Sequence, residues 1–129
     1  MAVAVKNLSI PQGAAFRIAF RKNTKSGVTL TPVSLAGKKA RMYFRRTLSD
    51  SEEPMVKLVS DTGLPEYTTS GFLTIEPSGD TGRVDVFLGA TLTHLLSTSG
   101  VWNLELYTTS DDVERLIGGS FELLRDATR

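Results

Sequence analysis

Hydrophobic and polar residues alternate along several short stretches of this chain. In 102–107, Trp102, Leu104 and Leu106 fall on one side of an extended chain, and more polar residues fall on the other. A period of two is typical of β-strands that bury one face in a sheet. The stretches with this alternation are residues 8–10, 14–21, 38–47, 55–59, 72–76, 83–88, 102–107, 113–118 and 120–124. The pattern therefore predicts an all-β domain.

Polar clusters rich in Gly, Asp, Ser and Asn separate the alternating stretches and predict turns. These clusters are residues 23–27, 49–54, 77–82 and 110–112. Residues 90–98 break the alternation, because Leu92, Leu95 and Leu96 stand at helical spacing. We expect one short helical crossover there, which Gly100 ends.

The length of 129 residues indicates a single domain. We expect an immunoglobulin-like or jelly-roll-like antiparallel β-sandwich of about seven to nine strands over residues 8–124. Residues 1–7 lack a periodic pattern and are expected to form a flexible N-terminal arm, with a C-terminal tail at 125–129. The residues that share the inward phase form the predicted core: Phe16, Ile18, Phe20, Met42, Phe44, Ile75, Val84, Val86, Trp102, Leu104 and Leu106.

The net charge of +1 conceals an uneven distribution of charge along the chain. Residues 1–49 contain ten basic residues and no acidic ones, whereas residues 50–129 contain all 14 acidic residues. One interpretation places oppositely charged strands side by side in one sheet, where facing charges stabilise modestly. The other places a basic and an acidic surface on the molecule, which would suit contact between neighbouring copies.

The residues that usually carry chemistry are scarce. The absence of cysteine excludes disulfides and thiolate metal sites. His94 is the only histidine, and no orienting acid or nucleophile can be assigned to it. The adjacent carboxylates at 52–53 and 111–112 fall in turns, where they are usually solvated. We therefore expect no catalytic, cofactor-binding or metal-binding residues, no cofactor and no enzymatic activity.

One strand combines basic residues with an aromatic side chain. Lys39, Arg41, Tyr43 and Arg45 project to the same side of the stretch 38–46, and Arg46 follows them. This face has three interpretations: a solvated surface paired with acidic neighbours, a docking site for a protein, or a site for single-stranded nucleic acid, which needs cations and a stacking ring. These five residues are the candidate partner-binding site.

Several motifs resemble a kind of structural module found in bacteriophages. They read LAG at 35–37, ARMYFR at 40–45, GFLTI at 71–75, GRVDVFL at 82–88, ATLTHLLSTSG at 90–100, WNLEL at 102–106, VERLIGGSFEL at 113–123 and ATR at 127–129. They are similar to the N-terminal domains of upper baseplate or fibre-attachment proteins. The resemblance implies a β-sandwich that docks onto the phage tail.

From this resemblance we expect a structural virion protein, a tail, baseplate or connector component that acts by multicopy assembly. Its expected partners are other phage structural proteins and copies of itself, as a homo-oligomer or ring. Its expected location is the virion, after synthesis in the host cytoplasm. No apolar run approaches the ~20 residues that span a bilayer, so no membrane association is expected. The alternatives are a capsid head-decoration protein and a nucleic-acid-binding accessory protein that uses strand 38–46.

Overall fold

A computed structural model shows eleven strands and one short helix in the described residues, which are 4–35, 37–47, 53–75, 82–109 and 112–125. The strands are β1 (Ala4–Val5), β2 (Leu8–Pro11), β3 (Phe16–Arg21), β4 (Asn23–Ser26), β5 (Thr29–Pro32), β6 (Lys39–Arg45), β7 (Val56–Val59), β8 (Gly71–Ile75), β9 (Arg83–Leu88), β10 (Gly100–Thr109) and β11 (Asp112–Leu124). The helix is α1 (Ala90–Leu95). It lies within the crossover predicted at 90–98.

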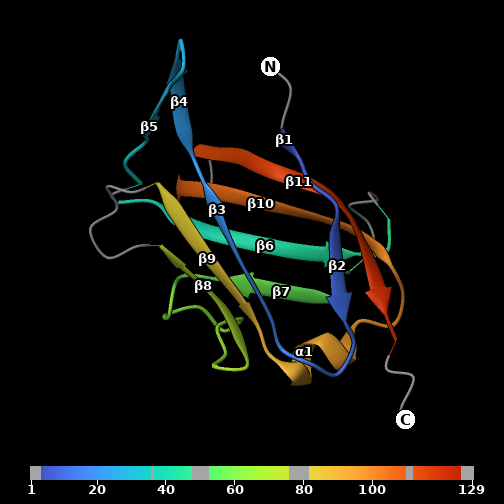
Figure 1. Ribbon diagram of the computed structural model, residues 1–129. Coiled ribbons are helices and arrows are strands. Elements are labelled where there is room, and N and C mark those ends of the chain that lie inside the picture. Colours follow the sequence, from blue (N-terminus) through green and yellow to red (C-terminus); the bar gives the residue numbers. More distant parts are fainter. Residues whose placement is uncertain (1–3, 36, 48–52, 76–81, 110–111, 126–129) are drawn as a thin grey trace.

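Two sheets face each other (Figure 1). The larger sheet has the order β1-β11-β10-β6-β7, with β2 also paired to β11, and the smaller has the order β3-β9-β8. The predicted all-β sandwich is therefore confirmed. One detail differs from the antiparallel expectation, because β1 and β2 both run parallel to β11.

The core lies between the two sheets, where the alternation predicted it. Eight of the predicted core residues are buried, and Phe16, Ile18 and Ile75 are partly buried against them. Phe20 on the smaller sheet stacks on Trp102 of the larger one, with ring centroids 5.3 Å apart. The buried residues outside the predicted set include Leu8, Ile10, Leu35, Leu58, Leu88, Leu96, Phe121 and Leu123.

The segment 23–27, predicted as a turn, instead begins a hairpin. β4 and β5 pair with each other, and the chain reverses at Gly27 and Val28, between the paired residues Ser26 and Thr29. Gly27 has a φ of 61°, which a glycine adopts without strain. The prediction was wrong because residues 23–26 are all polar in sequence, so no hydrophobic alternation marked them as a strand.

The described part of the N-terminal arm is attached to the larger sheet. Residues 4 and 5 pair with β11, and the Lys6 amide donates to the Gly118 carbonyl at 2.9 Å. Asn7 Oδ1 accepts a hydrogen bond from the Ser120 hydroxyl at 2.9 Å. These contacts attach residues 4–7 to the sheet, and the flexibility expected of the arm stays a prediction. Residues 1–3 and 126–129 of the predicted arm and tail lie outside the described residues.

Candidate interaction face

β6 directs its polar side chains to the outer face of the larger sheet. Ala40, Met42 and Phe44 point inward and are 0% exposed, so the residues between them point outward. The strand carries four of the five predicted site residues. They are Lys39, Arg41, Tyr43 and Arg45, while Arg46 follows the end of β6 and is exposed. The outward phase predicted for the residues of β6 is therefore observed, and their role in binding a partner stays a prediction.

The strand register brings neighbours from β10 and β7 beside these residues. Across β10, Arg41 is opposite Glu105 and Lys39 is opposite Tyr107. Across β7, Tyr43 is opposite Lys57. Sequence reasoning did not assign Lys57, Glu105 or Tyr107 to the site, because only the register between strands distant in sequence brings them there. We define the β6 face by six residues: Arg41, Tyr43, Arg45, Lys57, Glu105 and Tyr107.

Cations surround the aromatic rings of the β6 face. The Arg45 guanidinium lies 5.4 Å from the centre of the Tyr43 ring, and Lys57 Nζ lies 5.9 Å from it. Arg41 is 6.0 Å from the Tyr43 ring and 5.1 Å from the Tyr107 ring. Each distance lies within about 6 Å, where a cation is attracted to a ring face. The two tyrosines are thereby connected through Arg41.

An ion pair fixes the position of Arg41 between these rings. Its Nε donates to Glu105 Oε1 at 2.8 Å, and the two side chains are 32% and 18% exposed. Partial burial lowers the pKa of Arg41, but the hydrogen bond and negative charge of Glu105 outweigh that effect and raise it. A pair this accessible contributes up to about 1 kcal/mol to folding, so its main consequence is orientation of the guanidinium.

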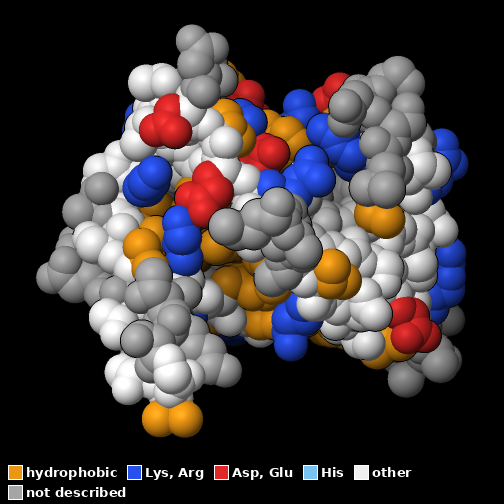
Figure 2. All heavy atoms as spheres, turned by 90° about the horizontal axis from the view of Figure 1, so that it is seen from above, with side chains coloured by type: hydrophobic (Ala, Val, Ile, Leu, Met, Phe, Trp, Pro, Cys, Tyr) orange, Lys and Arg blue, Asp and Glu red, His pale blue; other side chains and the backbone are white. Residues whose placement is uncertain are grey.

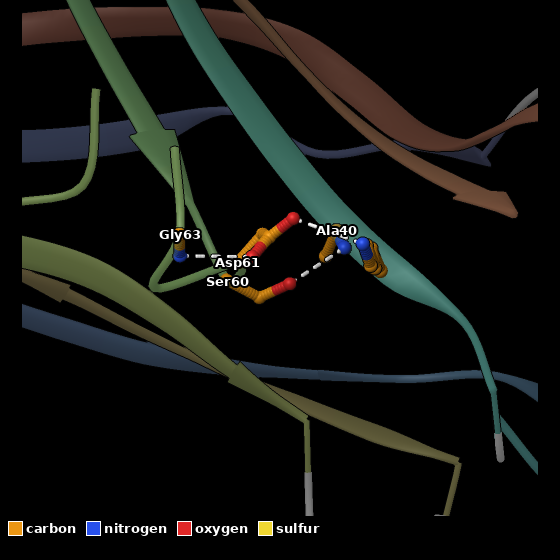
Figure 3. A network of polar contacts seen from close by, with 5 residues as sticks. Ala40, Ser60, Asp61 and Gly63 are labelled. Carbon is orange, nitrogen blue, oxygen red and sulfur yellow. Dashed lines mark hydrogen bonds and ion pairs between the residues drawn. The ribbon is translucent and has the colours of Figure 1, made fainter. Parts of the chain in front are cut away.

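A second polar network holds the first residues of β6 (Figure 3). Lys39 Nζ donates to Asp61 Oδ2 at 2.9 Å, and Asp61 Oδ1 accepts from the Gly63 amide at 2.9 Å. The Ala40 amide donates to the Ser60 hydroxyl at 2.9 Å. The hydrogen bond that Lys39 donates to Asp61 lowers the pKa of Asp61 and raises the pKa of Lys39. This network attaches β6 to the loop after β7.

Lys57 has an acidic partner of its own. Its Nζ lies 2.7 Å from Glu53 Oε1. The hydrogen bond lowers the pKa of Glu53 and raises the pKa of Lys57. Around the β6 face, Arg41 and Lys57 thus have carboxylate partners, and both tyrosine rings have cationic neighbours.

Pairing of basic residues from the first part of the chain with acidic residues from the second extends beyond this face. Besides the pairs of Lys39 and Arg41, Lys22 Nζ lies 2.7 Å from Glu114 Oε1. Figure 2 likewise shows Lys, Arg, Asp and Glu side chains interspersed when the molecule is seen from above. For these residues the structure favours the interpretation that opposite charges lie side by side within one fold.

A metal-binding cluster and a membrane-spanning helix are both absent from the described part of the chain. It contains no group of three or more His, Cys, Asp or Glu side chains placed to hold a metal ion. Within the same residues, no helix has the length and apolar character needed to cross a membrane. His94 is exposed on α1.

No protein-family model matches the chain, and no curated protein matches its sequence.

Proposed function

We propose that this chain is a structural protein of a bacteriophage virion, a tail, baseplate or connector component that assembles in several copies and docks through the β6 face. The observation that carries the proposal is the ordered row of Tyr43, Arg41 and Tyr107. Tyrosine and arginine are enriched among the few residues that carry most of the binding energy of protein interfaces, because both combine a large contact area with hydrogen bonding. Ion pairs and cation–ring contacts hold the three side chains in place before any partner binds, which reduces the entropy lost on docking.

The motifs that resemble phage structural modules also support this proposal. ARMYFR falls on β6, WNLEL on β10 and VERLIGGSFEL on β11, all in the larger sheet. GFLTI and GRVDVFL fall on β8 and β9 of the smaller sheet. The motifs thus account for the central strands of the fold and two of the strands around the β6 face.

The nucleic-acid alternative has weaker support on this face. Phosphate binding by Lys39 or Arg41 would compete with the carboxylates of Asp61 and Glu105, which lie 2.9 and 2.8 Å away. Base stacking on Tyr43 would compete with the cations already beside its ring. A labelled single-stranded oligonucleotide tests this alternative, because phosphate contacts give affinity that falls steeply as salt rises. The head-decoration alternative uses the same kind of interface and is separated by the experiment below.

The decisive experiment is mass spectrometry of purified virions, followed by separation of heads from tails. The proposal expects several copies of the chain per particle in the tail fraction. Recovery in the head fraction would favour the decoration alternative. Absence from purified particles would refute a virion role.

A variant pair tests the role of the β6 face itself. Tyr43→Ser with Tyr107→Ser removes both rings from the outer face and should strongly reduce incorporation into particles. Val28→Ser with Leu95→Ser, at exposed apolar positions between β4 and β5 and on α1, is a matched double control that should be incorporated normally. Circular dichroism of the isolated variants should show that both are folded. Normal incorporation of the tyrosine variant would exclude the β6 face as the docking surface.

A further inference from the structure

Among the described strands, β3 has one paired edge and one free edge. It lies at the end of the smaller sheet and pairs with β9. At the other end of that sheet, β8 packs against β6 and β7, so the two sheets meet on that side. The free edge of β3 borders the opposite side of the sandwich, toward β11 and β2 (Figure 1).

Core-facing side chains remain partly exposed along this side. Phe16 and Ile18 on β3 are only partly buried, and the same is true of Leu116 and Ile117 on β11. Seen from above, hydrophobic side chains lie at the bottom of a hollow between the two sides of the molecule (Figure 2). Partial exposure on both sheets at the same side leaves apolar surface that one more strand beside β3 would cover.

The outward residues of β3 determine which strand could fit there. Arg17, Ala19 and Arg21 are exposed. Antiparallel pairing with a second copy, centred on Ala19, would place Arg17 opposite Arg21, and like charges directly opposite each other destabilise a sheet. The same two guanidinium groups attract carboxylates at matching positions. The edge therefore disfavours a second β3 and favours an acidic strand.

We propose that the free edge of β3 binds an extended acidic segment of a partner protein by strand addition. In an antiparallel arrangement, the segment places carboxylates opposite Arg21 and Arg17, four residues apart. Apolar residues of the segment lie opposite Phe20 and Ile18 and cover the open side of the core. Main-chain hydrogen bonds to β3 provide the rest of the binding. The site is on the smaller sheet, so it is separate from the β6 face and can be tested independently of the proposed function.

The test uses the full chain and a labelled peptide whose centre reads Glu-Val-Thr-Val-Glu. A peptide with Lys-Val-Thr-Val-Lys at its centre is the charge-reversed control. Fluorescence anisotropy should show saturable binding of the Glu peptide that weakens as salt rises. The Lys peptide should bind at least about tenfold more weakly than the Glu peptide. The variant Arg17→Glu with Arg21→Glu should reverse this preference.

A second variant controls for net charge. Lys38→Glu with Arg125→Glu changes the charge by the same amount outside β3 and β11, and should leave the affinity for the Glu peptide within about twofold. Hydrogen exchange should slow in β3 when the Glu peptide binds. The proposal is overturned if the folded chain fails to bind the Glu peptide, if both peptides bind equally, or if protection arises on β7 or β11 and not on β3.

Discussion

The indole Nε1 of Trp102 donates to the backbone carbonyl of Lys6 at 3.2 Å, and to the Ser120 carbonyl at 3.1 Å. Opposite Trp102 in the sheet lies Gly119, whose missing side chain leaves space for the same Lys6 carbonyl. A Cβ on Gly119 would lie only 2.1 Å from that oxygen. Trp102 and Gly119 together therefore position the N-terminal segment against β11.

Gly119→Ala should lower the free energy of unfolding by about 1–3 kcal/mol, because the new methyl group collides with backbone and not with a movable side chain. Urea unfolding measures the loss. Gly63→Ala is the matched control, since its Cβ would sit 3.4 Å from Asp61 Oδ1, close to an ordinary contact. In a chain lacking residues 1–7, Gly119→Ala should lower the free energy of unfolding far less than in the full chain. A full penalty in the shortened chain would show that Lys6 is not the cause.

Deletion of residues 1–7 should itself destabilise the fold by about 1–2 kcal/mol, because the Trp102 indole loses one acceptor and β11 loses its β1 partner. Thermal unfolding of the shortened chain measures this effect. Asn7→Ala, which removes only the side-chain bond to Ser120, should cost less. An unchanged melting temperature after deletion would contradict this stabilising role and support the expectation of a flexible arm.

The loss of unfolding free energy on substitution in the core should depend on how deeply the side chain is buried, and not on residue type. Phe44→Ala should cost about 3–5 kcal/mol, because Phe44 is 0% exposed and packs edge-on against Phe121 with centroids 5.5 Å apart. Phe16→Ala, at a partly buried position on the β3 edge, should cost at least about 1 kcal/mol less. Denaturant unfolding of the two variants checks the order. Equal losses of unfolding free energy would mean that Phe16 is packed as tightly as Phe44.

Reversing charges on β6 should affect the monomer, because Arg41 is paired with Glu105 and Arg45 lies beside the Tyr43 ring. Arg41→Glu with Arg45→Glu places a carboxylate opposite Glu105 and should lower stability by about 1–2 kcal/mol. Adding Glu105→Arg to this variant should recover part of the loss, since the pair is then re-formed with reversed signs. Urea unfolding of the three proteins compares them. Absence of recovery would show that the loss does not come from the Arg41–Glu105 pair.

The ion pairs around the β6 face should give the fold sensitivity to acid. The Lys57 and Lys39 partners lower the pKa values of Glu53 and Asp61, so the unfolded chain binds protons more readily than the folded one. Their contribution is present above the unfolded values, near pH 4, and is lost as the pH falls through the lowered folded values. Lys57→Met with Lys39→Met should flatten stability against pH between about pH 5 and 2. An unchanged slope of stability against pH would mean that other carboxylates cause the sensitivity to acid.

The sequence by itself determined the class of fold, the phase of most strands and the outward face of β6. A side chain that alternates with a buried neighbour must point to the other face of the sheet, whatever strands lie beside it. That local rule was sufficient for Met42, Phe44, Leu104 and Leu106, which are all fully buried. It was also sufficient to place Arg41 and Tyr43 on one surface.

Only the tertiary structure decided which strands are neighbours, because hydrogen-bonded pairing between distant segments leaves no mark in local periodicity. The hydrogen bond between Arg41 and Glu105 joins residues 64 positions apart. The hydrogen bond from Trp102 to the Lys6 carbonyl joins residues 96 positions apart. The partial exposure of Phe16 and Ile18 depends on the position of β3 at the end of its sheet. Alternation specifies the face of a strand, while long-range packing decides its partners and therefore the surfaces left open for recognition.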